Sequence, residues 1–235
     1  MKIEELIIRE INKKKKINVS RFIELCQFEK DGYYINNNPI GSKNDFITAP
    51  EISQMFGEIL AIFLINYWEE KIKTDFNLIE LGPGRGTLTK DVLRVAKTKK
   101  KFFNASNLIL IEKNNYLIKL QKKNVRFDRI KWSKEFKIEK NNRPSVIYSN
   151  EFFDCFPVRQ FYKKEEWFEK FIKYNNSEKF FNFVSEKVTN EKLLSVLEKF
   201  NQFKIAEISY SRIKYFDLIC KFIKKNKGVF ITIDY

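Results

Sequence analysis

The stretch Leu78-Ile79-Glu80-Leu81-Gly82-Pro83-Gly84-Arg85-Gly86-Thr87 decides the fold class of this 235-residue chain. An apolar run ends in an acid, glycines follow at every second position, and an amphipathic stretch begins at Thr87. The pattern predicts a strand, a tight glycine turn and a helix N-terminus, which together can hold an anionic or nucleoside-like ligand against the backbone. The dinucleotide fingerprint G-x-G-x-x-G would require a third glycine at position 87, so the sequence disfavours a nicotinamide enzyme.

Strand and helix signals alternate on either side of this stretch. Strand-like apolar runs lie at 76–81, 108–111, 130–132, 145–149 and 229–233, and helical spacing lies at 88–95, 116–120 and 210–225. This rhythm predicts an α/β fold with a parallel, Rossmann-like sheet. Residues 158–184 break the rhythm with three aromatic runs, which predict an inserted β-meander.

The chain is expected to have two parts. Residues 1–75 form an N-terminal helical segment, with helices over 2–12 and 19–28, and residues 76–235 form the Rossmann-like domain. Because an apolar strand left at a sheet edge would be prone to aggregation, we expect the final strands of the sheet to be missing from a C-terminally truncated chain.

The glycine turn is the first candidate ligand site. Gly82, Gly84 and Gly86 let the backbone approach a ligand without a Cβ in the way. Thr87, or the N–H groups behind it, can receive a carboxylate at the helix N-terminus. The alternative is a glycine-rich turn that only packs.

Two acids accompany the turn. Glu112 ends the second strand, where a carboxylate can accept hydrogen bonds from both hydroxyls of a ribose. The alternative for Glu112 is a surface acid paired with Lys113. Glu80 is expected to order the turn or to contact an ammonium group, unless it is only a charge at the strand end.

A second polar cluster, Asn150, Glu151 and Asp154, follows the 145–149 strand. Open α/β sheets place their ligands at this end of the strands. Two carboxylates beside an amide suit a guanidinium, which donates hydrogen bonds in a planar fork, and they would localise its charge on one nitrogen and leave the other nucleophilic. Turn capping by Asn150 and Asp154 is the alternative.

A third cluster precedes the glycine turn. Thr48 and Glu51 have the T-x-x-E spacing of a capping box, so Glu51 serves either that box or a ligand. The helix that follows is expected to place one apolar face on the core, formed by Ile52, Phe56, Ile59, Leu60, Phe63 and Leu64. Asp45 lies in a polar loop, 36–47, that either closes over the site as a lid or only makes turns.

Composition excludes several classes of function. The absence of histidine rules out Ser-His-Asp and Cys-His mechanisms and His-ligated metals within this chain, and no metal is expected. Three isolated cysteines and no signal-like segment favour the cytoplasm, and no apolar run is long enough for membrane insertion. The net charge of +15 invites a nucleic-acid reading, but the lysines are spread along the chain, so nucleic acid is a disfavoured partner.

The three clusters together resemble a known family. The spacing E-x-G-x-G-x-G is typical of class I methyltransferases, which bind S-adenosylmethionine (S-adenosyl-L-methionine) as cofactor. The segments PIGSKNDFITAPEISQMFGE, LIELGPGRGTLTKDVLR and SNEFFDCFPVRQF are similar to the MidA/NDUFAF7 family. The resemblance implies a protein arginine methyltransferase whose mitochondrial members, in the matrix, methylate an arginine of a complex I subunit during assembly.

By position, the resemblance implies cofactor and pocket roles for the residues already singled out. The cofactor residues it implies are Gly82, Gly84, Gly86 and Glu112, and the pocket residues are Asp45, Glu51, Asn150, Glu151 and Asp154. Glu80 and Thr87 join the candidate cofactor residues because of their place beside the glycine turn. Asn44 and Tyr210 depart from the family pattern. Family chains also continue past Asp234-Tyr235 with a section that completes the sheet and part of the substrate wall.

Two rival functions stay open from the sequence. One is an assembly factor that binds the cofactor without catalysis, and the other is an RNA methyltransferase, whose RNA binding should weaken steeply with salt.

Overall fold

The computed structural model describes residues 2–36, 41, 45, 47–137 and 143–234. By its internal contacts the chain divides into two compact units, Met1–Tyr33 with Phe156–Lys214, and Tyr34–Cys155 with Tyr215–Tyr235. The expected domain boundary near residue 75 divides the chain differently and stays a prediction. No helix among the described residues is both long and apolar enough to cross a bilayer.

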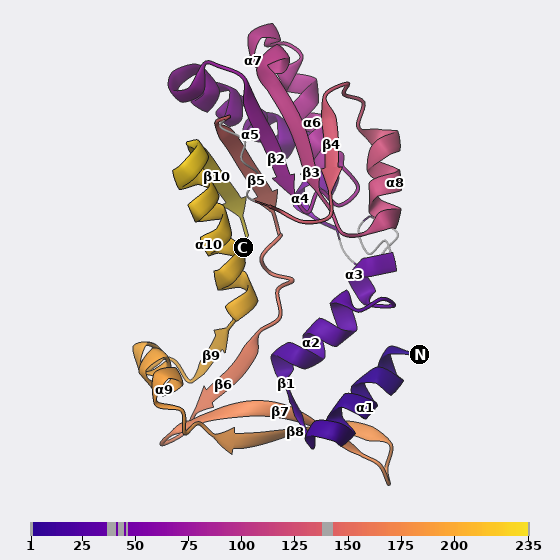
Figure 1. The fold of residues 1–235 in the computed structure, drawn as a ribbon, viewed down its shortest axis with the longest axis vertical. Helices are drawn as coiled ribbons and strands as arrows, with labels where there is room; N and C mark the ends of the chain where they lie inside the picture. Colours follow the sequence, from indigo (N-terminus) through magenta and orange to yellow (C-terminus); the bar gives the residue numbers. More distant parts are fainter. Residues whose placement is uncertain (1, 37–40, 42–44, 46, 138–142, 235) are drawn as a thin grey trace. The chain divides into compact units, whose positions relative to one another are not determined.

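The second unit contains a five-stranded sheet (Figure 1) in the order β10-β5-β2-β3-β4, and all its pairings are parallel. The strands are β2 (Phe76–Leu81), β3 (Ser106–Ile111), β4 (Ile130–Ser133), β5 (Ser145–Asn150) and β10 (Gly228–Ile233). The predicted Rossmann-like α/β sheet is therefore confirmed. The chain runs outward from β2 to β3 and β4 and then returns to β5 on the other side of β2. Open α/β sheets bind ligands at the carboxyl ends of strands beside such a reversal.

Helices cover this sheet and bury its central strand completely. They are α5 (Gln54–Tyr67), the π-helical turn η1 (Trp68–Ile72), α6 (Thr87–Ala96), α7 (Lys100–Ala105), α8 (Asn115–Asn124) and α10 (Tyr210–Asn226), whose later part belongs to this unit. Every residue of β2 is buried, as expected for a parallel strand with both faces covered. The short helix α7 was not among the helices predicted from the sequence.

The predicted capping box before α5 is wrong. Thr48 is the N-cap of a separate short helix, α4 (Ala49–Ile52), and its side chain makes no cap hydrogen bond. Ser53 caps α5 instead, because its hydroxyl accepts a hydrogen bond from the Met55 N–H at 3.2 Å. A break at Ser53 starts a new helix and changes which residues of α5 face inward.

The predicted apolar face of α5 is accordingly only partly right. Leu60 and Leu64 are buried, whereas Ile52, Ile59 and Phe63 are exposed. The buried stripe runs through Gly57, Leu60, Ala61, Leu64 and Ile65. A Cβ on Gly57 would lie 2.6 Å from the Cβ of Asp91, so the glycine permits the close approach of α5 to α6 that sets this stripe.

The first unit is built on an antiparallel sheet. The strands β6 (Arg159–Lys163), β7 (Trp167–Asn175) and β8 (Phe180–Lys187) form the predicted meander. Two further strands join it, β1 (Ile17–Asn18) against β7 and β9 (Ile205–Ile208) against β6. The helices of this unit are α1 (Ile3–Lys14), α2 (Val19–Phe28) and α9 (Glu191–Leu197), with the 3-10 turn η2 (Glu198–Phe200) after α9. Short helices α3 (Tyr33–Asn36) and α4 lie in the chain between the N-terminal helices and α5.

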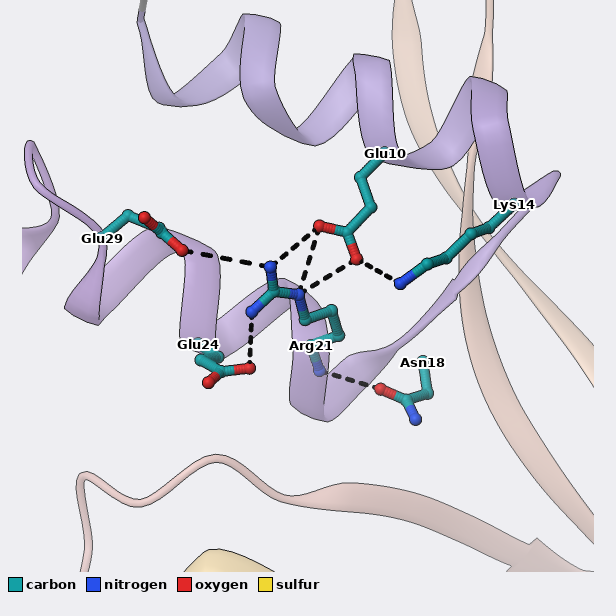
Figure 2. A network of polar contacts seen from close by, with 6 residues as sticks. All are labelled: Glu10, Lys14, Asn18, Arg21, Glu24 and Glu29. Carbon is teal, nitrogen blue, oxygen red and sulfur yellow. Dashed lines mark hydrogen bonds and ion pairs between the residues drawn. The ribbon is translucent and has the colours of Figure 1, made fainter.

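An ion-pair network joins α1 to α2 (Figure 2). The Glu10 carboxylate accepts hydrogen bonds from Arg21 Nε and Nη2, each at 3.0 Å, and from Lys14 Nζ at 2.7 Å. Arg21 also donates to Glu24 at 2.8 Å, and its backbone N–H donates to the Asn18 side chain, the N-cap of α2. The hydrogen bond from Arg21 lowers the pKa of Glu10 from 4.5 to about 2.

Glu10→Gln is expected to destabilise the first unit by about 1 kcal/mol at pH 7, the upper end for partly exposed ion pairs. Because the pKa of Glu10 is lower in the folded chain, its contribution is present above pH 4.5 and is lost as pH falls toward 2. Urea unfolding of the wild type and the variant between pH 2 and pH 7 measures this difference. Glu4→Gln, an exposed acid of α1, is the control for loss of one charge, and a pH-independent difference for Glu10→Gln would contradict the assignment.

Candidate functional site

The glycine turn leaves β2 at the carboxyl end of the parallel sheet. Gly82, Gly84 and Gly86 have φ angles of 63°, 54° and 80°, in the left-handed region that residues with a Cβ rarely adopt. The Gly82 N–H donates to the Ile111 carbonyl at 3.0 Å, and the Gly86 N–H donates to the Pro83 carbonyl at 2.8 Å. Gly86 is the N-cap of α6 and has no side-chain acceptor for the first N–H groups of that helix.

Glu51, the expected pocket residue of α4, lies against the turn. One of its carboxylate oxygens accepts a hydrogen bond from the Thr87 hydroxyl, and the other pairs with Arg85 Nη1 at 3.4 Å. The Thr87 hydroxyl is therefore already engaged. Of the two groups that the sequence offered for a ligand carboxylate, the backbone N–H groups at the start of α6 are the better placed.

Glu80 is a buried residue of β2, two positions before the glycine turn. Its carboxylate accepts hydrogen bonds from the Thr89 hydroxyl and from the Tyr148 hydroxyl, the latter at 2.9 Å. Burial raises the pKa of Glu80 to about 7, against the opposing effect of these two hydrogen bonds. The contacts tie β2 to α6 and β5, which suits the expected role of ordering the turn.

Glu112 follows β3 directly and is 9% exposed, which argues against the alternative of a surface acid. Its Oε1 accepts a hydrogen bond from the Asn114 N–H at 2.9 Å, and its Oε2 accepts one from Gln121 Nε2 at 3.3 Å. Asn114 in turn caps α8. Burial raises the pKa of Glu112 to about 7, and the hydrogen bonds oppose that shift.

Strand register places the three candidate groups at one level of the sheet. Leu81, the last residue of β2, pairs with Ile111 of β3 and with Ser149 of β5. The residues that follow these three are Gly82, Glu112 and Asn150. The structure therefore brings the turn, the expected ribose acid and the expected pocket amide to the same edge, beside the reversal of strand order.

The pocket cluster begins where β5 ends. Glu151 has a φ of 47°, and its N–H donates to the Ile233 carbonyl at 2.8 Å, so the chain bends sharply there. Asn150 Nδ2 lies 3.4 Å from Glu151 Oε1. Asn150 Oδ1 is buried and has no hydrogen-bond partner within the described residues. Asp154 is exposed.

Phe152 connects the pocket cluster to the glycine turn and was not among the predicted site residues. A Cβ on Gly82 would lie 2.7 Å from Phe152 Cδ2, so the ring packs directly on that glycine. The ring also contacts Phe153 and Tyr215, with centroid distances of 5.2 Å and 5.3 Å. The signal in the sequence was the aromatic pair between the two acids.

Two amides of α8 also hold the turn and were missed. Gln121 Nε2 donates to the Gly84 carbonyl at 2.7 Å, and Asn124 Nδ2 donates to the Arg85 carbonyl at 3.0 Å. Gln121 lies one helical turn after Leu117, and both are buried. A polar residue on the apolar stripe of a helix was the available signal for Gln121.

Asp45, the expected lid residue, is exposed, and residues 44 and 46 on either side of it lie outside the described residues, as does most of the 36–47 loop. The departure noted at Asn44 also lies outside them. In the part of the chain that the structure describes, no group of three or more Cys, Asp or Glu side chains could hold a metal ion.

Comparison with known proteins gives one family match and several relatives. The family described as S-adenosyl-L-methionine-dependent methyltransferase matches residues 59–235. The chain is 35% identical over 167 residues to the mitochondrial protein arginine methyltransferase NDUFAF7 of Rattus norvegicus, which covers 60% of this chain and 38% of the relative. The human (Homo sapiens) protein of the same name is 36% identical over 166 residues, which cover 60% of this chain and 38% of the relative. The Xenopus laevis protein is 34% identical over 182 residues, which cover 66% of this chain and 42% of the relative. The chain thus spans 38–42% of the length of these relatives.

Two solved structures from Burkholderia thailandensis share the fold. One, bound to S-adenosyl-homocysteine, aligns with a TM-score of 0.81, and the match covers 93% of this chain and 58% of the Burkholderia chain. The other, a native crystal structure, aligns with a TM-score of 0.75, and the match covers 93% of this chain and 57% of the Burkholderia chain. Both are 19% identical to this chain, so the likeness concerns the fold.

Proposed function

The chain belongs to the S-adenosyl-L-methionine-dependent methyltransferase family, and we propose that it binds this cofactor at the glycine turn and transfers a methyl group to a protein arginine. The proposal rests on one observation. A turn of three left-handed glycines, a buried acid and an amide whose oxygen has no partner among the described residues lie at one level where three adjacent parallel strands end. One relative of the same fold is bound to S-adenosyl-homocysteine, the product of such a transfer.

The residues present fit the cofactor. The backbone of Gly82, Gly84 and Gly86 would accept its amino-acid end, whose carboxylate suits the N–H groups at the start of α6. The Glu112 carboxylate would accept both ribose hydroxyls. When bound, the cofactor supplies an electrophilic methyl group on a sulfonium sulfur.

Asn150, Glu151 and Asp154 would receive the arginine. Two carboxylates can hold a guanidinium in one plane and concentrate its positive charge on the nitrogens they face, which leaves the remaining nitrogen more nucleophilic. A carboxylate at that place can also take the proton that the methylated nitrogen loses. An unpaired buried oxygen costs about 1–3 kcal/mol, and a guanidinium N–H donated to Asn150 Oδ1 would recover it. Alignment of the two reactants can contribute about 7–11 kcal/mol to catalysis.

The choice of a protein arginine follows the names of the relatives, which are mitochondrial protein arginine methyltransferases. We extend it to a respiratory complex I subunit as substrate and to an assembly role, on the strength of the family resemblance. For a bacterial chain the same activity would take place in the cytoplasm, and for a eukaryotic chain in the mitochondrial matrix.

The activity is tested by incubating the purified chain with purified respiratory complex I and S-adenosyl-L-methionine carrying a deuterated methyl group. Mass spectrometry is expected to find the label on arginine and to lose it in the Asp154→Asn variant. Cofactor binding without label on any arginine would favour a non-catalytic assembly factor. Label on added RNA in place of protein would favour an RNA methyltransferase.

The affinity for S-adenosyl-homocysteine is expected to rise with pH between 6 and 8. Burial raises the pKa of Glu112 to about 7, so the carboxylate that must accept two ribose hydroxyls is mostly protonated at pH 6 and ionised at pH 8. Coupling to one such group changes the dissociation constant by up to about tenfold per pH unit below the pKa. Calorimetric titrations across this range measure how the affinity changes with pH. The Glu112→Gln variant is expected to bind S-adenosyl-homocysteine weakly, with an affinity that hardly depends on pH. An equally steep slope in that variant would assign the dependence to another group.

A further inference from the structure

We propose that Gln121 is a positioning residue that couples the glycine turn to the Glu112 carboxylate, so that both groups are presented to the cofactor together. This inference rests on the proposed cofactor site. It adds a residue that would act on the cofactor through Gly84 and Glu112 and not by direct contact. Gln121 lies on α8 and has no exposed surface. Its amide lies between three elements, the turn after β2, the acid after β3, and β4.

The three contacts leave one orientation for the amide. Nε2 donates to the Gly84 carbonyl at 2.7 Å and to Glu112 Oε2 at 3.3 Å, while Oε1 accepts from the Trp132 indole N–H at 3.0 Å. Two acceptors at one end and one donor at the other match the two N–H groups and the oxygen of a glutamine side chain. A flipped amide would oppose donor to donor and acceptor to acceptor, so the network specifies its own geometry.

The packing at the same place is tight. A Cβ on Gly86 would lie 3.4 Å from Gln121 Cγ and 2.9 Å from Val125 Cγ2, so the turn fits closely against this end of α8. Asn124 adds a second hydrogen bond to the turn at the Arg85 carbonyl, but it has no contact with Glu112 among the hydrogen bonds of the described residues. Both Gln121 and Asn124 therefore donate a hydrogen bond to a carbonyl of the turn, and Gln121 also orients the Glu112 carboxylate.

This geometry gives Gln121 a defined effect on ligand binding. The Glu112 carboxylate is held by the backbone N–H groups of Lys113 and Asn114 and by the Gln121 amide, and this fixes the direction in which its free lone-pair capacity meets the ribose hydroxyls. Donation from Gln121 also favours the ionised carboxylate. Loss of the amide would let Glu112 rotate and would favour its protonated form, and both changes weaken ribose binding.

The test is calorimetry of S-adenosyl-homocysteine with Gln121→Met, which keeps the length of the side chain and removes its hydrogen-bonding groups. We expect about a tenfold loss of affinity at pH 7, since hydrogen bonds to charged groups are the strong ones. The pH midpoint of binding should move upward, because the opposing hydrogen bond to Glu112 is gone. Glu80 and Lys113 lie near Glu112. The Glu80 carboxylate is held by Thr89 and Tyr148, whereas the Gln121 amide donates to Glu112, so the shift reports on Glu112.

Matched variants separate positioning from packing. Asn124→Leu removes the other amide of α8 and is expected to leave the pH midpoint unchanged. In the Glu112→Gln background, Gln121→Met should cost less affinity than in the wild type, because both changes remove the contact between Gln121 and the Glu112 carboxylate and only the Gly84 contact is left to lose. If Gln121→Met alone melts below the assay temperature, Gln121→Met with Trp132→Phe removes the indole donor that it would leave unpaired and takes its place.

Failure of this inference differs from failure of the proposed function. Absence of S-adenosyl-homocysteine binding by the wild type at every pH would overturn the function. Wild-type binding with an unchanged midpoint in Gln121→Met, or with losses that add fully to those of Glu112→Gln, would overturn the positioning role alone.

Discussion

Gly84→Val is expected to abolish binding of S-adenosyl-homocysteine, with a loss of at least about 100-fold in affinity. Gly84 has a φ of 54°, and a β-branched residue in that region is a steric outlier. The valine side chain would also occupy the approach path of a ligand to the turn, and a shifted backbone would move the carbonyl that Gln121 binds. Calorimetry and a thermal melt on the same sample measure the two effects.

A matched control separates backbone strain from the site. Lys73 has a φ of 62° at the end of η1, outside the turn, and it is exposed. Lys73→Val should lower the melting temperature and leave the affinity within twofold. Gly84→Ala should fall between wild type and Gly84→Val, because a left-handed alanine costs roughly 1–2 kcal/mol. Unchanged affinity in Gly84→Val would remove the turn from the site.

Asp154→Asn and Glu151→Gln are expected to lower methyl transfer by at least about 100-fold while cofactor affinity stays within twofold. Each change keeps the shape of the side chain and removes the negative charge that holds a guanidinium, and positioned charges of this kind contribute about 10²–10³ in rate. Glu151 and Asp154 follow the strand on the far side of β2 from Glu112, which explains why binding should be spared.

The measurement is the rate of label transfer to arginine together with calorimetry on each variant. Glu135→Gln removes an exposed acid whose carboxylate pairs with Lys137, and it serves as the charge control. Equal rates in the wild type and both pocket variants would show that the guanidinium is held elsewhere. A parallel loss of cofactor affinity would place the two acids in the cofactor site.

The parallel sheet could be predicted from the sequence because its signals are local. Each strand is a short apolar run. A glycine turn follows β2, an acid follows β3, and β5 ends in an amide, and all three are recognisable in the sequence. The rule that ligands bind at the carboxyl ends of parallel strands then grouped Gly82, Glu112 and Asn150 without any knowledge of their distances.

The remaining features depend on contacts between distant residues. The break at Ser53 turned an expected capping box into two helices, and Glu51 found partners in Arg85 and Thr87 more than thirty positions away. Gly57 moved the buried stripe of α5 because α6 lies against it. Likewise, no local pattern pairs β1 with β7, which joins Ile17 to Ile172.

The most direct test of the cofactor site is a crystal structure of this chain with S-adenosyl-homocysteine. The amino-acid end of the ligand is predicted to lie on the backbone of Gly82–Thr87, with both ribose hydroxyls within hydrogen-bond distance of Glu112. A ligand bound away from this turn, or one whose ribose leaves Glu112 without a contact, would contradict the assignment.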